Sequence, residues 1–103
     1  MPKQIELVKL HAAAGEASKL LKVLSNPDRM LLLCQMTQGE FSVKELETIT
    51  GILQPTLSQQ LTVLREERLV STRREGKQIF YSISSSEALA VLQVLYQLYC
   101  TTE

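Results

Sequence analysis

Two thiols are the most reactive side chains in this 103-residue sequence. Cys34 and Cys100 lie far apart along the chain, and the single histidine is His11. Residues 1–6 carry charges of both signs and do not lead into the apolar core of a secretory signal peptide, so we expect a cytoplasmic protein. Because thiols in that compartment are normally kept reduced, a transient or sensing role is favoured over a structural disulfide.

A second chemical feature is a series of uncharged polar side chains between residues 54 and 62. If this segment is helical, Leu57, Leu61 and Leu64 form its buried stripe and the polar side chains face solvent. Amides and hydroxyls can hydrogen-bond base edges in the major groove of DNA, and a helix N-terminus favours phosphate. We therefore predict a base-reading surface, with an ordinary solvated helix as the alternative. Its candidate residues are Gln54, Thr56, Ser58 and Gln59.

Cations cluster in a third place, around a turn in the second half of the chain. Arg73, Arg74, Lys77 and Gln78 flank this turn, although the chain as a whole has a net charge of zero. Positive side chains on a projecting hairpin suit contact with DNA phosphates, which position a protein on a duplex without specifying sequence. We predict a DNA-binding role for these four residues, and a solvated turn is the alternative.

Capping signals indicate the helices that present the polar surface. Asn26 and Pro27 are typical of a helix start, and Ser42 and Glu45 have the spacing of a capping box. Gly51 suits a left-handed turn before the next helix. Two short helices joined by such a turn are typical of a helix-turn-helix motif. The predicted helices cover residues 27–37, 42–49 and 55–66.

The hydrophobic period then changes from the helical value to two residues. Segments 69–74 and 77–83 therefore predict two strands, with Glu75 and Gly76 as a two-residue turn between them. A helix-turn-helix followed by a β-hairpin is the arrangement of a winged helix. The predicted fold is mainly α with a small hairpin, in the order α-α-α-α-β-β-α.

The two terminal helices are predicted to join two subunits. They cover residues 4–24 and 87–100, and apolar side chains surround most of the second one. In a domain this small, a second copy related by a twofold axis is the simplest cover for such a helix. We therefore predict a homodimer. The predicted organisation is one domain over 1–103, with dimerisation helices in 1–24 and 85–100, a helix-turn-helix in 42–66 and a wing in 69–83.

Composition excludes several classes of protein. A hydrophobic content of 45% excludes a disordered chain, and no apolar run reaches the roughly 20 residues that span a bilayer. The sequence also has no paired catalytic carboxylates, no glycine-rich phosphate loop and no Ser/His/Asp set. We therefore expect neither an enzyme nor a membrane protein, and no cofactor.

Two segments give the chain a family resemblance. Residues 24–29 read Leu-Ser-Asn-Pro-Asp-Arg, and residues 54–61 read Gln-Pro-Thr-Leu-Ser-Gln-Gln-Leu. Both resemble the ArsR/SmtB family of dimeric bacterial transcriptional repressors, and the resemblance covers nearly the whole chain. It implies a homodimer on a near-palindromic DNA operator, with Gln54, Ser58 and Gln59 in the recognition helix.

The cysteines and two further segments resemble one branch of that family. Segments 39–43 and 77–81, with one thiol facing apolar neighbours and the other near a helix end, resemble the BigR/SqrR branch, whose paired cysteines sense persulfides and related reactive sulfur species. The resemblance implies that the repressor releases DNA when Cys34 and Cys100 become linked, through a disulfide or a longer polysulfide.

Two other functions stay open at the level of sequence. A thiophilic metal or metalloid could bind through Cys34, Cys100 and His11. Metal-sensing family members typically carry Cys-x-Cys in the second helix or His and carboxylates on the last helix, and neither pattern is present, so no metal site is expected. Alternatively, the chain is a protein-interaction or thiol-exchange module that does not bind DNA.

Overall fold

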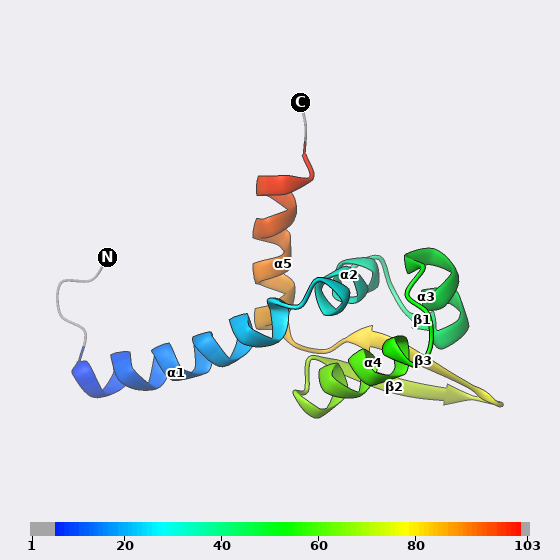
Figure 1. The fold of residues 1–103 in the computed structure, drawn as a ribbon. Coiled ribbons are helices and arrows are strands. Elements are labelled where there is room, and N and C mark those ends of the chain that lie inside the picture. The colour runs from blue at the N-terminus through cyan, green and yellow to red at the C-terminus, as the bar shows by residue number, and fades with distance from the viewer. Residues whose placement is uncertain (1–5, 102–103) are drawn as a thin grey trace.

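The computed structural model describes residues 6–101 and contains five helices and three strands in that range (Figure 1). The predicted helix over 4–24 begins at Leu7, and residues 4 and 5 lie outside the described part of the chain. The other predicted helices are all found, with ends that differ by at most one residue. The elements are α1 (Leu7–Leu24), α2 (Pro27–Met36), β1 (Phe41–Ser42), α3 (Val43–Thr50), α4 (Thr56–Glu66), β2 (Val70–Glu75), β3 (Gln78–Ile83) and α5 (Ser86–Tyr99).

Side-chain caps begin α2 and α3 as their residue types predicted. The Asn26 side chain accepts a hydrogen bond from the Arg29 amide at 3.0 Å, which satisfies one free N–H of the first turn of α2. At α3 both bonds of the capping box are present, because Ser42 accepts from the Glu45 amide at 3.1 Å and Glu45 accepts from the Ser42 amide at 2.8 Å. Gly51 ends α3 in a left-handed conformation, with φ 76°. These predictions are confirmed.

The hairpin is present, but its turn is shifted by one residue. Glu75 pairs with Gln78, so the turn consists of Gly76 and Lys77 rather than Glu75 and Gly76. Gly76 has φ 64° and occupies the first turn position, where a positive φ is easiest for a residue without a Cβ atom.

The sheet also contains a strand that the hydrophobic pattern did not reveal. Strand β1 has two residues and pairs with β3, which places β3 in the middle of an antiparallel sheet of order β1-β3-β2. A two-residue strand is too short to show a period, and its pairing partner lies far along the chain. The architecture is nevertheless the winged helix that was predicted.

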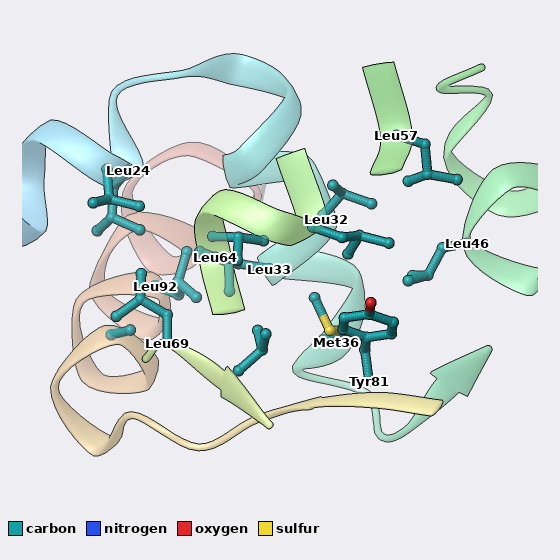
Figure 2. Close-up of a cluster of buried hydrophobic side chains, with 14 of the residues drawn as sticks. Leu24, Leu32, Leu33, Met36, Leu46, Leu57, Leu64, Leu69, Tyr81 and Leu92 are labelled. Carbon is teal, nitrogen blue, oxygen red and sulfur yellow. The ribbon is translucent and has the colours of Figure 1, made fainter. Parts of the chain in front are cut away.

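The core lies where α2, α3 and α4 meet the sheet and the start of α5 (Figure 2). Leu57, Leu61 and Leu64 are fully buried and confirm the predicted inner stripe of α4. Leu92 joins α5 to the same cluster, and Tyr81 closes it from the central strand. Pro55 was predicted as the first residue of α4 but immediately precedes that helix. The core thus fixes α4 with its polar side turned outward.

Helices α1 and α5 leave most of their length uncovered in a single chain. In Figure 1, α1 projects away from the body on one side and α5 rises from the sheet. Only Val23 and Leu24 of α1, and Ala88 and Leu92 of α5, are buried. Exposed apolar residues on these two helices are Leu7, Val8, Leu10, Leu21, Val94, Tyr96, Leu98 and Tyr99. Within residues 6–101, no helix has both the length and the apolar character needed to cross a membrane.

Candidate DNA-binding surface and thiol pair

The outward side of α4 carries the predicted base-reading residues. Ser58 and Gln59 are exposed, and Thr56 is half-buried at the first position of the helix. Gln54 is also exposed, but its Oε1 accepts a hydrogen bond from the Ser58 amide at 3.0 Å. Gln54 therefore satisfies a free N–H of the first turn of α4 and keeps its own amide N–H groups available.

Arg29 orients this helix, which the sequence analysis did not anticipate. Its Nε donates to the Val23 carbonyl at 2.8 Å, and its Nη1 donates to Gln60 Oε1 at 3.0 Å. One side chain therefore connects the end of α1, the start of α2 and the middle of α4. The only sequence signal for Arg29 was its place in the family-like segment 24–29. Nothing in the sequence identified Gln60 as its partner.

The wing presents its cations in two different ways. Lys77 is exposed at the tip, Gln78 is exposed beside it, and Arg74 donates from Nε to the Gly76 carbonyl at 3.3 Å. Neither Arg74 nor Lys77 forms a salt bridge to a carboxylate among residues 6–101. Both can therefore approach DNA phosphate without first leaving an ion pair.

Arg73 differs from its neighbours, because carboxylates already occupy its guanidinium. Nη2 lies 2.8 Å from Glu40 Oε1 and Nη1 lies 2.9 Å from Glu75 Oε1. The predicted phosphate contact through Arg73 would require these ion pairs to rearrange. Glu40 is a second residue that the sequence analysis missed.

Both thiols are free and exposed in the described chain. Cys34 lies in the last turn of α2 and Cys100 caps the C-terminal end of α5. The expectation that Cys34 faces apolar neighbours is corrected, since Leu32, Leu33 and Met36 take the inner positions of α2 and leave Cys34 on its outer side. The helical rotation between successive residues separates these faces.

The charge of Cys100 nevertheless acts on the Cys34 thiol. Surrounding protein atoms raise the pKa of the Cys34 thiol, and negative charge on Cys100 raises this pKa further. A like charge has this effect only when the two groups lie close in space. Cys34 and Cys100 are therefore within electrostatic reach of each other in one chain, although α2 and the end of α5 are distant in sequence.

Among the described residues, the structure does not bring His11, the third ligand of the metal-sensing alternative, to the two thiols. His11 lies on the exposed part of α1. No three His, Cys, Asp or Glu side chains between residues 6 and 101 gather as a set that could hold a metal ion.

Known proteins are similar to this chain both in sequence and in the arrangement of helices. The model of the family described as "Bacterial regulatory protein, arsR family" matches residues 26–72. The Biofilm growth-associated repressor of Xylella fastidiosa (strain Temecula1) is 53% identical over 90 residues, which are 87% of this chain and 79% of that relative. The chain belongs to the arsR family.

Solved structures of two similar proteins agree with this assignment. The transcriptional repressor BigR from Xylella fastidiosa matches this arsR-family protein with a TM-score of 0.87 at 47% identity, covering 95% of this chain and 100% of that one. The Mb0332 domain of Mycobacterium bovis, described as a homodimeric winged helix-turn-helix DNA-binding domain, matches with a TM-score of 0.73 at 28% identity, covering 95% and 89%. The family consists of regulators rather than enzymes, as predicted.

Proposed function

We propose that this arsR-family protein is a homodimeric repressor that binds a near-palindromic DNA operator while its thiols are reduced, and that reactive sulfur species release it by linking Cys34 to Cys100. The observation that carries the proposal is that two free, exposed thiols lie on different helices and that the charge of Cys100 acts on the Cys34 thiol. A link between them would join the helix-turn-helix half of the chain to the uncovered helix α5.

The exposed side of α4 and the wing tip support DNA binding. The candidate base contacts are Gln54, Thr56, Ser58 and Gln59, and the candidate phosphate contacts are Arg74, Lys77 and Gln78. Amide and hydroxyl groups at a helix N-terminus suit base edges and phosphate, while isolated cations suit the backbone alone. The similarity to repressors named in two of the comparisons supports the direction of regulation.

Dimerisation is supported by the apolar faces that α1 and α5 leave open. A second copy could cover both, and the Mycobacterium bovis relative is described as homodimeric. Two recognition helices reach successive major grooves only if they lie about 34 Å apart. A small change of dimer shape therefore changes affinity, and a bias of about 1–3 kcal/mol corresponds to a 5- to 150-fold effect.

Linkage by a persulfide donor balances without another oxidant. One cysteine thiolate attacks the outer sulfur of the donor R–S–SH, which leaves R–SH and a cysteine persulfide. The other thiolate attacks the inner sulfur of that persulfide and releases hydrogen sulfide, so that the two thiols are oxidised and two donor sulfur atoms are reduced. A direct disulfide requires Cα atoms within about 7 Å, and each additional bridging sulfur from another donor molecule relaxes this limit.

Serine variants of the two cysteines test the switch. We expect C34S and C100S to bind DNA as tightly as the reduced wild type and to keep binding after a persulfide donor is added, because neither can form the link. The probe is a labelled duplex selected from a random library by the reduced protein, and the readout is fluorescence anisotropy with intact mass of each sample.

Four outcomes would contradict the proposal. Loss of reduced-state binding in both variants would assign the cysteines to packing. Equal release by hydrogen peroxide or diamide would remove the preference for sulfur donors. Release by anaerobic zinc or arsenite, with a matching mass increase, would favour the metal-sensing alternative. If the reduced wild type prefers no selected duplex over random DNA, the chain acts as an interaction or thiol-exchange module instead.

A further inference from the structure

One side-chain cluster spans the sheet beside the wing and is left unexplained by the proposed function. Arg73 donates to both carboxylate oxygens of Glu40, from Nε to Oε2 at 3.0 Å and from Nη2 to Oε1 at 2.8 Å. Nη1 donates to Glu75 at 2.9 Å. The same guanidinium lies over the Phe80 ring, 4.9 Å from its centroid. A forked carboxylate pair and an aromatic face together fix the orientation of a guanidinium.

This cluster connects the hairpin to the rest of the domain. Glu40 immediately precedes β1, which pairs with β3, while Arg73 lies on β2 opposite Phe80. Because β3 is the central strand, the bond from Glu40 to Arg73 joins one edge of the sheet to the other. Glu40 also lies in the short connection from α2, the helix that carries Cys34. The contact therefore links the wing to the segment that leads into the helix-turn-helix.

The charge of the cluster makes Arg73 a poor partner for phosphate. One guanidinium faces two carboxylates, so the group is negative overall when all three are ionised. The hydrogen bond from Arg73 lowers the pKa of Glu40, so this carboxylate is ionised at neutral pH and stays ionised at lower pH than an isolated glutamate. Three guanidinium N–H groups are already used by carboxylate oxygens. An approaching phosphate would meet local repulsion.

We propose that Glu40 and Arg73 are a positioning pair that holds the wing in its DNA-binding direction, and that Arg74 and Lys77, without Arg73, supply the phosphate contacts. The proposal rests on the proposed DNA binding but is independent of the thiol switch. It reassigns Arg73 from a DNA contact to a residue that acts through the wing.

Two glutamate variants separate positioning from simple electrostatics. E40Q and E75Q each remove one negative charge next to Arg73, and electrostatics alone predicts tighter DNA binding by both. Only E40Q removes the charged, forked contact that joins Glu40, next to β1, to Arg73 on β2. We expect E40Q to bind about tenfold more weakly, if each of the two released wings of a dimer spends about one third of its time in the competent direction. We expect E75Q to bind as tightly as the wild type or more tightly.

Two arginine variants separate positioning from phosphate contact. Removal of one phosphate contact makes the fall of log K with log salt less steep by about 0.9. R74Q should therefore reduce the steepness of this fall by about 1.8 in a dimer. R73Q should weaken binding about as much as E40Q while leaving the slope near its wild-type value. The double variant E40Q/R73Q should be no weaker than either single variant, because both variants break the same interaction.

The measurements use the full chain, kept reduced, with a duplex that the wild type selects from a random library. Thermal unfolding of each variant identifies loss of fold, and amide exchange of residues 70–83 should be faster in E40Q than in E75Q. The proposal is overturned if E40Q binds as tightly as E75Q, or if R73Q lowers the salt slope as R74Q does. If the reduced wild type binds no duplex, the proposed function fails as well. A normal effect of persulfide with no difference between E40Q and E75Q refutes the positioning pair alone.

Discussion

Cys34 shows how the surroundings of a single residue set its chemistry. Its side chain is exposed, yet protein atoms around the thiol and the charge of Cys100 both raise its pKa. The thiolate is the nucleophile in sulfur transfer, so a raised pKa makes Cys34 react more slowly at neutral pH than an ordinary cysteine. Its reactivity should then depend on the state of the other cysteine.

The pH dependence of Cys34 alkylation tests this coupling. Because the raised pKa favours the protonated thiol, alkylation by iodoacetamide should increase with pH through a midpoint above the ordinary thiol range. In C100S the midpoint should move down, since one of the two causes is removed, and burial should keep it above the ordinary value. Peptide mass spectrometry at a series of pH values gives the midpoint. An identical midpoint in C100S would show that the thiols do not interact.

Gln59 and Gln60 are adjacent on α4, but we expect them to have different roles. Gln59 is exposed, while Gln60 accepts a hydrogen bond from the Arg29 guanidinium. We expect Q59A to change which bases the protein prefers, at a discrimination of about 1–3 kcal/mol per contacted base pair. Q60A should weaken binding to all sequences without changing the preference. Selection from a random duplex library by each variant measures both effects, and an unchanged preference in Q59A would remove it from the reading surface.

At the scale of elements, the end of α4 sets the path into the wing. The Leu69 amide donates to the Leu64 carbonyl and the Arg68 amide donates to the Arg65 carbonyl, each at 3.0 Å. This is the Schellman pattern, which requires a left-handed residue after the helix. Arg68 takes that position with φ 64°, where glycine is usual.

Replacing Arg68 by glycine should therefore stabilise the fold. A left-handed residue with a Cβ atom costs about 1–2 kcal/mol, and the greater freedom of unfolded glycine returns about 0.5–1 kcal/mol of that cost. We expect R68G to raise the free energy of unfolding by about 0.5–1 kcal/mol. R68A is the matched control, because it removes the side chain and keeps the Cβ atom. Urea denaturation measures both variants, and an equal gain in R68A would assign the effect to the arginine side chain.

At the scale of the molecule, we expect the uncovered helices α1 and α5 to determine how many chains assemble. Leu98 on α5 and Leu53 in the turn before α4 have nearly equal exposed fractions, 67% and 68%. Only Leu98 belongs to the apolar face that we expect a second copy to cover. The two residues therefore form a matched pair for a test of assembly.

Lysine at these positions should have different consequences. An unpaired charge buried in an interface costs about 3–5 kcal/mol, which corresponds to more than a 100-fold weaker dimer. L98K should therefore sediment as a monomer at micromolar concentration and lose DNA affinity, while L53K should remain dimeric. Analytical ultracentrifugation distinguishes these states. A dimeric L98K would exclude this part of α5 from the interface.

Residue types and their spacing were enough to predict the elements whose cause is local. The caps of α2 and α3 join residues three positions apart, the leucine stripe of α4 follows the helical period, and the segments 24–29 and 54–61 identified the family. Such features depend on neighbours along the chain, so residue types and spacing are sufficient to predict them.

Contacts between side chains that are distant in sequence could be found only in the folded chain. Glu40 reaches Arg73 across 33 positions because β1 pairs with β3, and Arg29 reaches Gln60 across 31 because α2 packs on α4. The influence of Cys100 on Cys34 depends in the same way on where α5 runs. Strand register and helix packing create these contacts, and neither leaves a periodic trace in the residues that take part.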